Sequence, residues 1–188
     1  MHIHFGQTFN GNRSLTLPDS LGQQVLGPTG LLNLLETHLG LLVFLPTQSE
    51  RIVQFRNVLN VCKEQAFYHK SFELDELGTA RTLLQWRDTW YLHGWQGRFD
   101  LGVSGQLAMM AEVEASAVTT VACCEGQRLQ AVLQMLEGGS IVPIRQISLY
   151  DEMESFPLAW RRVLERLPCK IVQPEPAGHG AALDAASA

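Results

Sequence analysis

Residues 71–97, SFELDELGTARTLLQWRDTWYLHGWQG, form the stretch on which the fold prediction rests, and they hold three of the four tryptophans. Acidic residues at its start and basic residues toward its end suit the dipole of a single helix. At about 100° per residue, most of its large apolar side chains fall on one half of that helix. These are Leu77, Ala80, Leu83, Leu84, Trp86, Trp90 and Tyr91. The pattern predicts one long helix with an apolar face in the core.

Arg87 lies inside this apolar half. A guanidinium there must be paired, or its stem must lie across the indoles with the charged head reaching out. We expect a structural Arg87, held by a carboxylate or by backbone carbonyls. The alternative is a contact with a partner protein or a DNA phosphate. Trp90 and Trp95 have a similar alternative, as stacking platforms for single-stranded DNA, although their apolar arc favours core packing.

The composition and the net charge limit the classes of function that this chain can have. A chain of 188 residues with 46% hydrophobic and 18% charged residues is typical of a globular protein with a real core. The net charge of −5 argues against a free-standing nucleic-acid binder, but not against a DNA-handling role shared with a partner. The four cysteines form no C-x-x-C pair, which favours a reduced, cytoplasmic protein. No apolar run approaches the roughly 20 residues that span a bilayer, so no membrane association is expected.

The rest of the chain predicts a helix-rich α/β domain with a small, mostly parallel sheet over residues 1–173. Residues 174–188 are small and flexible in composition and are expected to form a linker. Residues 118–124 either extend a helix or form a strand. The last strand, helix and strand imply a parallel pair. Strands are expected at 2–9, 141–149 and 169–172, and further helices at 28–40, 48–65 (with Ser49 as N-cap), 105–116, 127–136 and 151–167.

Two glycine pairs have the spacing of a phosphate-binding loop. The pair Gly22-x4-Gly27 precedes Pro28, Thr29 and a helix, but proline stands where the motif needs lysine. Proline supplies neither a positive charge nor an N–H donor. The other pair, Gly6-x4-Gly11, is followed by Asn-Arg. The sequence therefore predicts no nucleotide-binding residue.

Other catalytic patterns are also missing from the sequence. There is no H-E-x-x-H motif, no nucleophile elbow and no E-x-K of a metal-dependent nuclease. His2 and His4 would share one face of a strand, but a third metal ligand is lacking. Asp151, Glu152 and Glu154 are expected at a helix start, where they suit the dipole. We therefore predict no catalytic, metal-binding or cofactor-binding residue in this chain.

Five stretches occur in an order that resembles the N-terminal region of AddB/RexB-type helicase–nuclease subunits, which belong to the PD-(D/E)XK nuclease family. They are GPTGLLNLLETHLGL, SERIVQFRNVL, YHKSFELDELGTARTLLQWRDTWYLHGW, LAMMAEVEA and ISLYDEMESFPLAWRRVLERL. The resemblance covers most of residues 1–170. Its most specific part is FELDELGTARTLLQWRDTWYLHGW, and none of the five is a catalytic motif.

This resemblance implies a large protein that pairs with an ATP-driven helicase subunit and processes double-strand DNA ends for recombinational repair. The N-terminal region of the family resembles a superfamily 1 helicase motor, a RecA-like layer that is often degenerate. The family's nuclease domain lies near the C-terminus, with a divalent metal and commonly an iron–sulfur cluster. The chain departs from that pattern, because it lacks the phosphate-binding lysine, the cluster cysteines and the nuclease domain.

The expected function is thus a non-catalytic, helicase-like domain that serves as scaffold, docks the helicase partner or guides DNA. Two alternatives stay open. One is a self-contained small α/β enzyme or protein that binds a nucleotide or another ligand, which binding of ATP would favour. The other is an interaction module unrelated to DNA, which would show no salt-dependent binding to single-stranded DNA.

Overall fold

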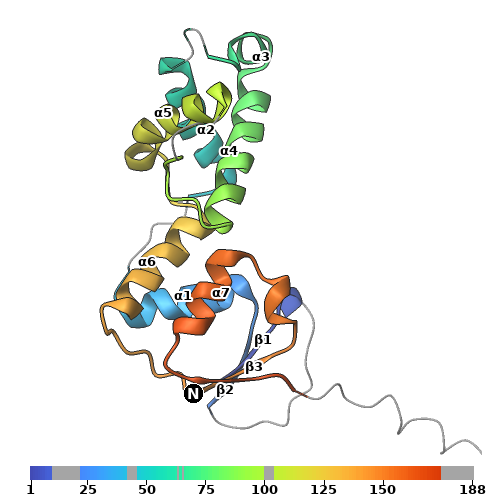
Figure 1. Cartoon of the computed structure of the whole chain (residues 1–188). Helices are drawn as coiled ribbons and strands as arrows, with labels where there is room; N and C mark the ends of the chain where they lie inside the picture. The colour runs from blue at the N-terminus through green and yellow to red at the C-terminus, as the bar shows by residue number, and fades with distance from the viewer. Residues whose placement is uncertain (10–21, 42–45, 63, 65, 100–103, 175–188) are drawn as a thin grey trace, which may run out of the picture. The chain divides into compact units, whose positions relative to one another are not determined.

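The computed structural model describes residues 1–9, 22–41, 46–62, 64, 66–99 and 104–174. Its described part is a helix-rich α/β fold (Figure 1), as the sequence predicts. The chain divides into two compact units. The sheet unit comprises Met1–Leu31, Pro143–Ser155 and Pro168–Ala188, and the helical unit comprises Leu32–Val142 and Phe156–Leu167. The linker expected at 174–188 lies outside the described residues, apart from Pro174.

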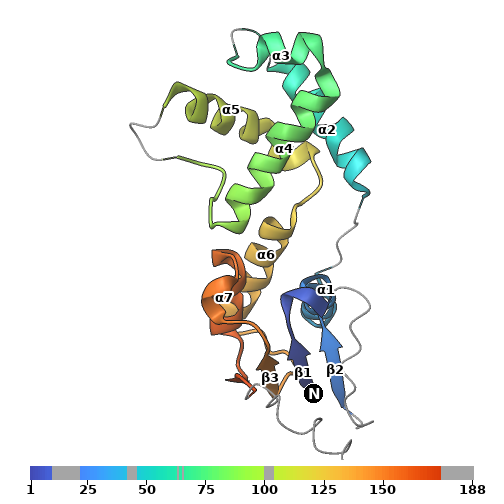
Figure 2. The same cartoon turned by 90° about the vertical axis from the view of Figure 1, so that its right-hand side faces the viewer.

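The sheet unit is built on four parallel strands in the order β2-β1-β3-β4. The strands are β1 (His2–Phe5), β2 (Gln23–Leu26), β3 (Gln146–Leu149) and β4 (Lys170–Val172). Figure 2 shows the first three side by side. The predicted small parallel sheet is confirmed, and so is the parallel pairing of the last two strands. Alternation along β1 and β3 gives one face of buried Ile3, Phe5, Ile147 and Leu149, and an opposite face with His2, His4 and Ser148.

Three details of the sheet differ from the predictions. The first strand ends at Phe5, and Gln7–Phe9 form a 3-10 helix (η1). The third begins only at Gln146, after Pro143, which cannot donate to a strand ladder. The strand β2 was not predicted at all. It occupies the residues between the two glycines of Gly22-x4-Gly27, so this stretch is an extended strand and not a phosphate-binding loop.

The helix α1 (Pro28–Leu39) begins at Pro28 and ends before Gly40 (φ +70°), as predicted. The helix α2 (Gln48–Val61) is capped by Thr47, not by the predicted Ser49. The Thr47 side chain accepts a hydrogen bond from the Glu50 N–H, and the Glu50 carboxylate accepts one from the Thr47 N–H. This reciprocal pair is a capping box, which satisfies two N–H groups of the helix start.

Replacing Thr47 with alanine is expected to lower the free energy of unfolding by about 1 kcal/mol, because the cap of α2 is lost. The matched control is Ser49→Ala, two residues further along in the same first turn, which is expected to change the stability by less than about 0.5 kcal/mol. Urea unfolding followed by circular dichroism measures both. A larger loss for Ser49→Ala than for Thr47→Ala would contradict the observed cap.

The stretch predicted as one helix over residues 71–97 is in fact two helices, α3 (His69–Leu74) and α4 (Glu76–Leu92). Asp75 separates them: its backbone is extended (φ −150°, ψ 91°), and its carboxylate accepts the Gly78 N–H at 2.8 Å. Aspartate is a strong N-cap, so it starts a new helix instead of continuing the first. The apolar face is also narrower than predicted, because Leu77 and Trp86 are 51% and 47% exposed.

The remaining helices are α5 (Gly105–Thr120), α6 (Glu125–Glu137) and α7 (Leu158–Arg166). For residues 118–124, the first part extends α5, and Val121 ends it in an extended conformation. The helix expected from residue 151 begins only at Leu158, after Pro157, while Met153–Ser155 form a short 3-10 helix (η2). Asp151, Glu152 and Glu154 therefore do not start α7, which corrects the prediction.

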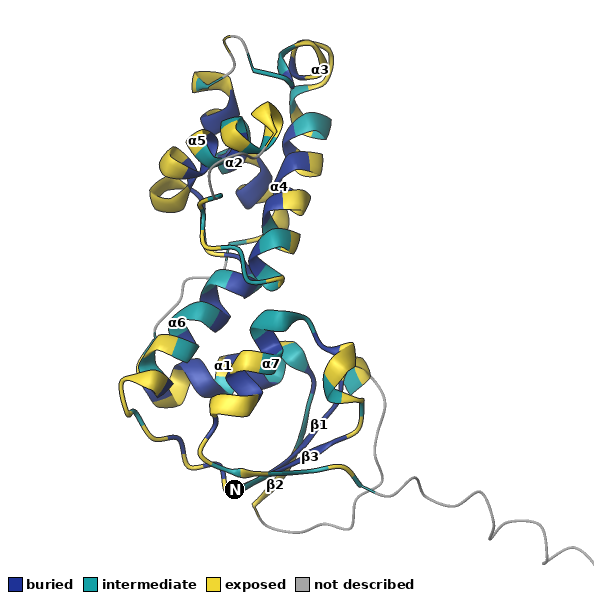
Figure 3. Ribbon diagram, in the orientation of Figure 1, coloured by how far each residue is buried: buried dark blue, intermediate teal, exposed yellow. Residues whose placement is uncertain are grey.

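Within the helical unit, α4 packs against α2, α3 and α6, α2 also against α5, and α6 against α7. In Figure 3, α2, α4 and α5 each carry buried and exposed residues, as helices that cover one core do. No single helix among the described residues is long and apolar enough to cross a membrane, and the pair α5–α6, which is apolar enough only when taken together, bends by 71°.

Candidate functional site

Arg87 on α4 is fully buried and is held by Glu114 on α5. The two side chains form a bidentate pair, with Nε to Oε2 at 2.5 Å and Nη2 to Oε1 at 2.8 Å. The Tyr91 hydroxyl donates to the same carboxylate at 2.8 Å. Arg87, which was expected to be held by a carboxylate or by backbone carbonyls, is thus held by the Glu114 carboxylate. In this conformation the guanidinium does not reach the surface, where a partner or a DNA phosphate would lie.

The electrostatics of this site follow from burial and pairing. Burial by itself lowers the pKa of Arg87, but the hydrogen bond and the charge of Glu114 outweigh it and raise this pKa, so the guanidinium stays charged. Burial, together with the Glu114 carboxylate, also raises the pKa of Tyr91. Tyr91 therefore keeps its proton and remains a hydrogen-bond donor to Glu114.

A second ion pair lies beside the first. Arg51 on α2 binds both carboxylate oxygens of Asp88 on α4, at 2.6 and 2.8 Å, and donates from Nε to the Ala122 carbonyl at 3.1 Å. Asp88 Oδ1 is 3.7 Å from Arg87 Nη1, which has no hydrogen-bond partner. The two arginines and two carboxylates join α2, α4 and α5. These ion pairs hold the three helices together, which is a structural role.

Trp90 and Trp95 contact each other and Phe99. The ring centroids of Trp90 lie 5.5 Å from both Trp95 and Phe99 in edge-on geometry, while Trp95 and Phe99 stack at 5.0 Å. Both tryptophans are half-buried, and Trp90 packs against the core of the helical unit. Their faces are therefore largely engaged within the protein. Trp86, which the sequence placed in the core, is the more exposed indole.

The carboxyl edge of the sheet brings together a group of residues that the sequence did not predict to lie side by side. The chain passes from β1 to β2 on one side and from β3 to β4 on the other, so the strand order reverses between β1 and β3. Open parallel sheets bind ligands at this switch point. Here the Gln7 N–H donates to Asp151 Oδ2 at 2.7 Å, and the Gln7 side-chain amide donates to Ser155 Oγ at 2.8 Å. We call Gly6, Gln7, Asp151 and Ser155 the switch-point site.

The switch-point site is arranged against anions. A phosphate-binding loop offers free backbone N–H groups after its strand, whereas the Gln7 N–H is occupied by a carboxylate of the same chain. A phosphate at this amide would also meet the negative charge of Asp151. Space is limited too, since a Cβ on Gly6 would lie 3.0 Å from the Phe9 ring and 3.2 Å from Asp151 Oδ2. The signal in the sequence was the run ISLY directly before Asp151, which marks the end of a strand.

His2 and His4 do share one face of β1, as predicted, with ring centroids 4.4 Å apart. His2 Nε2 is hydrogen-bonded to Ser148 Oγ at 2.9 Å, and His4 to Tyr150 and Gln23 at 3.1 Å each. Burial, His4 and the N-terminal amine lower the pKa of His2, which favours a neutral ring. The described residues contain no group of three His, Cys, Asp or Glu side chains that could hold a metal ion.

Cys124, at the start of α6, gives a pH-dependent prediction. Burial raises the pKa of its thiol to about 11, from 9.0 for a free cysteine. The folded protein therefore holds this proton more tightly than the unfolded chain. The resulting stabilisation is complete below about pH 9 and is lost as the pH rises toward 11.

We expect the free energy of unfolding of Cys124→Ala to depend less steeply on pH than that of the wild type, in urea titrations between about pH 8 and 11. The exposed Cys123 gives the control, Cys123→Ala; equal slopes for all three proteins would contradict the buried thiol.

Comparison with known proteins identifies no family. No family model matches the chain, and no curated protein matches its sequence. A functional assignment therefore depends on the arrangement described above and on the resemblance of the five stretches.

Proposed function

We propose that this chain is a degenerate RecA-like domain, of the superfamily 1 helicase type, from an AddB/RexB-type helicase–nuclease subunit. In this role it does not hydrolyse ATP. It serves as scaffold for the helicase partner and guides DNA within the complex, in the cytoplasm, during repair of double-strand breaks. The metal and the iron–sulfur cluster of the family belong to its nuclease domain.

One observation carries this proposal: the contact between the Gln7 N–H and Asp151 at the switch point. A working motor of this type needs a lysine and free N–H groups after a strand, because they hold the nucleotide phosphates. In this chain the corresponding edge of a parallel sheet presents a carboxylate already bound to the amide. A sheet edge at which a carboxylate of the same chain occupies this amide is what a degenerate helicase domain would have.

The helical unit supports a role in assembly. It comprises Leu32–Val142 and Phe156–Leu167, and it has a core of its own. Buried ion pairs link its helices: Arg87 with Glu114, Arg51 with Asp88, and Arg128 on α6 with Glu36 on α1. A unit braced in this way can present a surface of fixed shape to a partner.

The proposal is tested by affinity purification of the chain from its native cells, with bound proteins identified by mass spectrometry. We expect a superfamily 1 helicase subunit in stoichiometric amount. The control is the same purification with an unrelated tagged protein of similar charge. Recovery of the chain alone, or with proteins that have no link to DNA, would contradict the proposal and favour an unrelated interaction module.

A further inference from the structure

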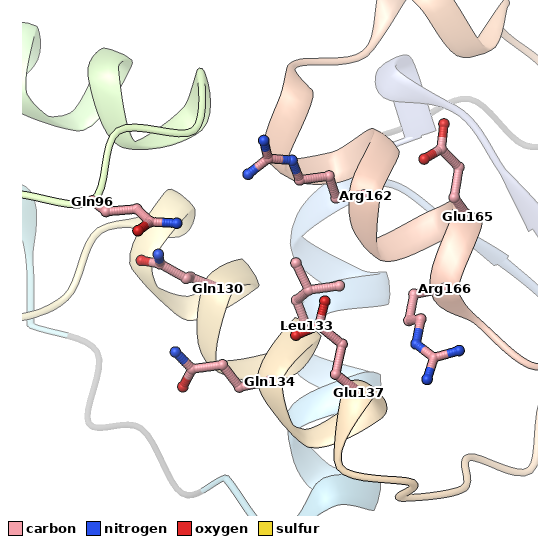
Figure 4. Close-up of a pocket in the computed structure, with 8 residues that line it drawn as sticks. All are labelled: Gln96, Gln130, Leu133, Gln134, Glu137, Arg162, Glu165 and Arg166. Atoms are coloured by element: carbon pink, nitrogen blue, oxygen red, sulfur yellow. The ribbon is translucent and has the colours of Figure 1, made fainter.

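A polar pocket of about 440 Å³ opens in the helical unit, with walls from the loop after α4 and from α6 and α7. Figure 4 shows Gln96, Gln130 and Gln134 on one side of it, and Arg162 and Arg166 on α7 on the other. None of these residues belongs to the switch-point site or to the buried ion pairs.

The walls of the pocket are fixed by close packing. On α6, a Cβ at Gly126 would lie only 2.5 Å from the Tyr91 backbone, so α6 touches α4 directly. The Trp160 Nε1 on α7 donates to Glu125 on α6 at 2.7 Å. Arg162 Nη1 lies 3.5 Å from the position of a Cβ on Gly94, which places this guanidinium beside the loop that carries Gln96.

The two arginines have no carboxylate partner among the described residues, in contrast to Arg51, Arg56, Arg87 and Arg128. Arg162 and Arg166 are both exposed and stand four residues apart on α7, so they lie one above the other on one face. Guanidinium groups match the geometry of phosphate oxygens. Two unpaired guanidiniums at the edge of a pocket therefore favour a ligand with more than one phosphate.

The other residues that line the pocket favour a ligand that carries hydrogen-bonding groups in addition to phosphates. Three glutamine amides offer both donors and acceptors, as the edges of nucleic-acid bases do. Glu137 and Glu165 also line the pocket and can accept from base amino groups, but they would repel a ligand made of phosphate alone. Unpaired bases expose these edges, whereas a duplex hides them. A single strand, which carries phosphates and open base edges together, fits the whole set.

We propose that this pocket contacts single-stranded DNA, with Arg162 and Arg166 on the phosphates and the glutamine amides on the bases. The inference rests on the proposed function, because it names the surface by which the domain guides DNA. Since the chain has a net charge of −5, the binding is weak and sensitive to salt.

The test is fluorescence anisotropy of a labelled, mixed-sequence single strand of about 20 nucleotides, at about 50 mM salt and above. The double variant Arg162→Gln/Arg166→Gln is compared with Arg81→Gln/Arg145→Gln, a control of the same charge whose arginines are exposed and lie outside the pocket. We expect at least tenfold weaker binding for the first variant. Its slope of log K against log salt should fall by about 1.4, as for two phosphate contacts to a single strand. The control variant should lose less than about threefold.

A second arm adds inorganic pyrophosphate as competitor, against sodium chloride of equal ionic strength. Pyrophosphate is expected to displace no more DNA than chloride does. Stronger displacement would assign the pocket to a free phosphate compound and overturn the proposal. Equal losses in the two double variants, or no binding by the wild type, would overturn it as well. If the affinity purification recovers a helicase but the chain does not bind single-stranded DNA, only this inference is wrong and the proposed function still holds.

Discussion

Replacing Glu114 with alanine is expected to lower the free energy of unfolding by about 3–5 kcal/mol, the usual cost of leaving a buried charge without its partner. Arg87 would lose both hydrogen bonds to the carboxylate, and the Tyr91 hydroxyl would lose its acceptor. Arg87 has no access to water that could replace the lost contacts, because its side chain is fully buried. Urea unfolding followed by circular dichroism measures the effect.

Two controls separate charge pairing from packing. Glu112→Ala, at an exposed position of the same helix, is expected to change the stability by less than about 0.5 kcal/mol. The triple variant Arg87→Met/Tyr91→Phe/Glu114→Leu removes every polar group of the site and is expected to recover most of the loss, to within about 2 kcal/mol of the wild type. If Glu114→Ala unfolds like the wild type and yet no longer binds a helicase partner, Arg87 is a contact residue and the structural reading is wrong.

Gly126→Ala is expected to destabilise the helical unit by about 3 kcal/mol, at the upper end of the range for overpacked sites. The new Cβ would lie 2.5 Å from the Tyr91 carbonyl carbon and 2.6 Å from the Leu92 nitrogen. These are backbone atoms of α4, so no flexible side chain can move aside, and α6 must shift away from α4. Thermal unfolding reports the loss as a lower melting temperature.

The loss of stability expected for Gly126→Ala is opposite in sign to the intrinsic helix preference of the two residues. Within a helix, alanine is intrinsically favoured over glycine by about 1 kcal/mol. Gly105, at the start of α5, has nothing within 4 Å of its Cβ position, so Gly105→Ala should leave the melting temperature unchanged or raise it slightly. Of these two glycine-to-alanine changes in helices, only Gly126→Ala is thus expected to lower the stability. A gain in stability for Gly126→Ala would show that α4 and α6 do not touch at this point.

Local signals in the sequence were sufficient for several elements. Pro28 and Gly40 marked the two ends of α1, because their backbone preferences act at a single residue. The apolar surroundings of Arg87 predicted that a carboxylate or backbone carbonyls must hold it. They did not predict that the partner is Glu114, since Glu114 is 27 residues away along the chain and reaches Arg87 only through the tertiary placement of α5.

Other features depend on contacts that no local pattern contains. The four residues of β2 form a strand because β1 pairs with them, and their sequence QQVL has little strand character of its own. Asp75 suits both the first turn of a helix and an N-cap, so the break between α3 and α4 was ambiguous. The contact of Gln7 with Asp151 joins residues 144 positions apart, and it exists only because β1 and β3 are neighbours in the sheet.

The central claim is the proposal that this chain is a degenerate motor domain that binds no nucleotide, and isothermal titration with ATP and Mg²⁺ tests it most directly. With Asp151 bound to the Gln7 N–H, we predict no heat of binding up to millimolar ATP. Binding of ATP with a micromolar Kd would contradict the account and would favour a small nucleotide-binding protein.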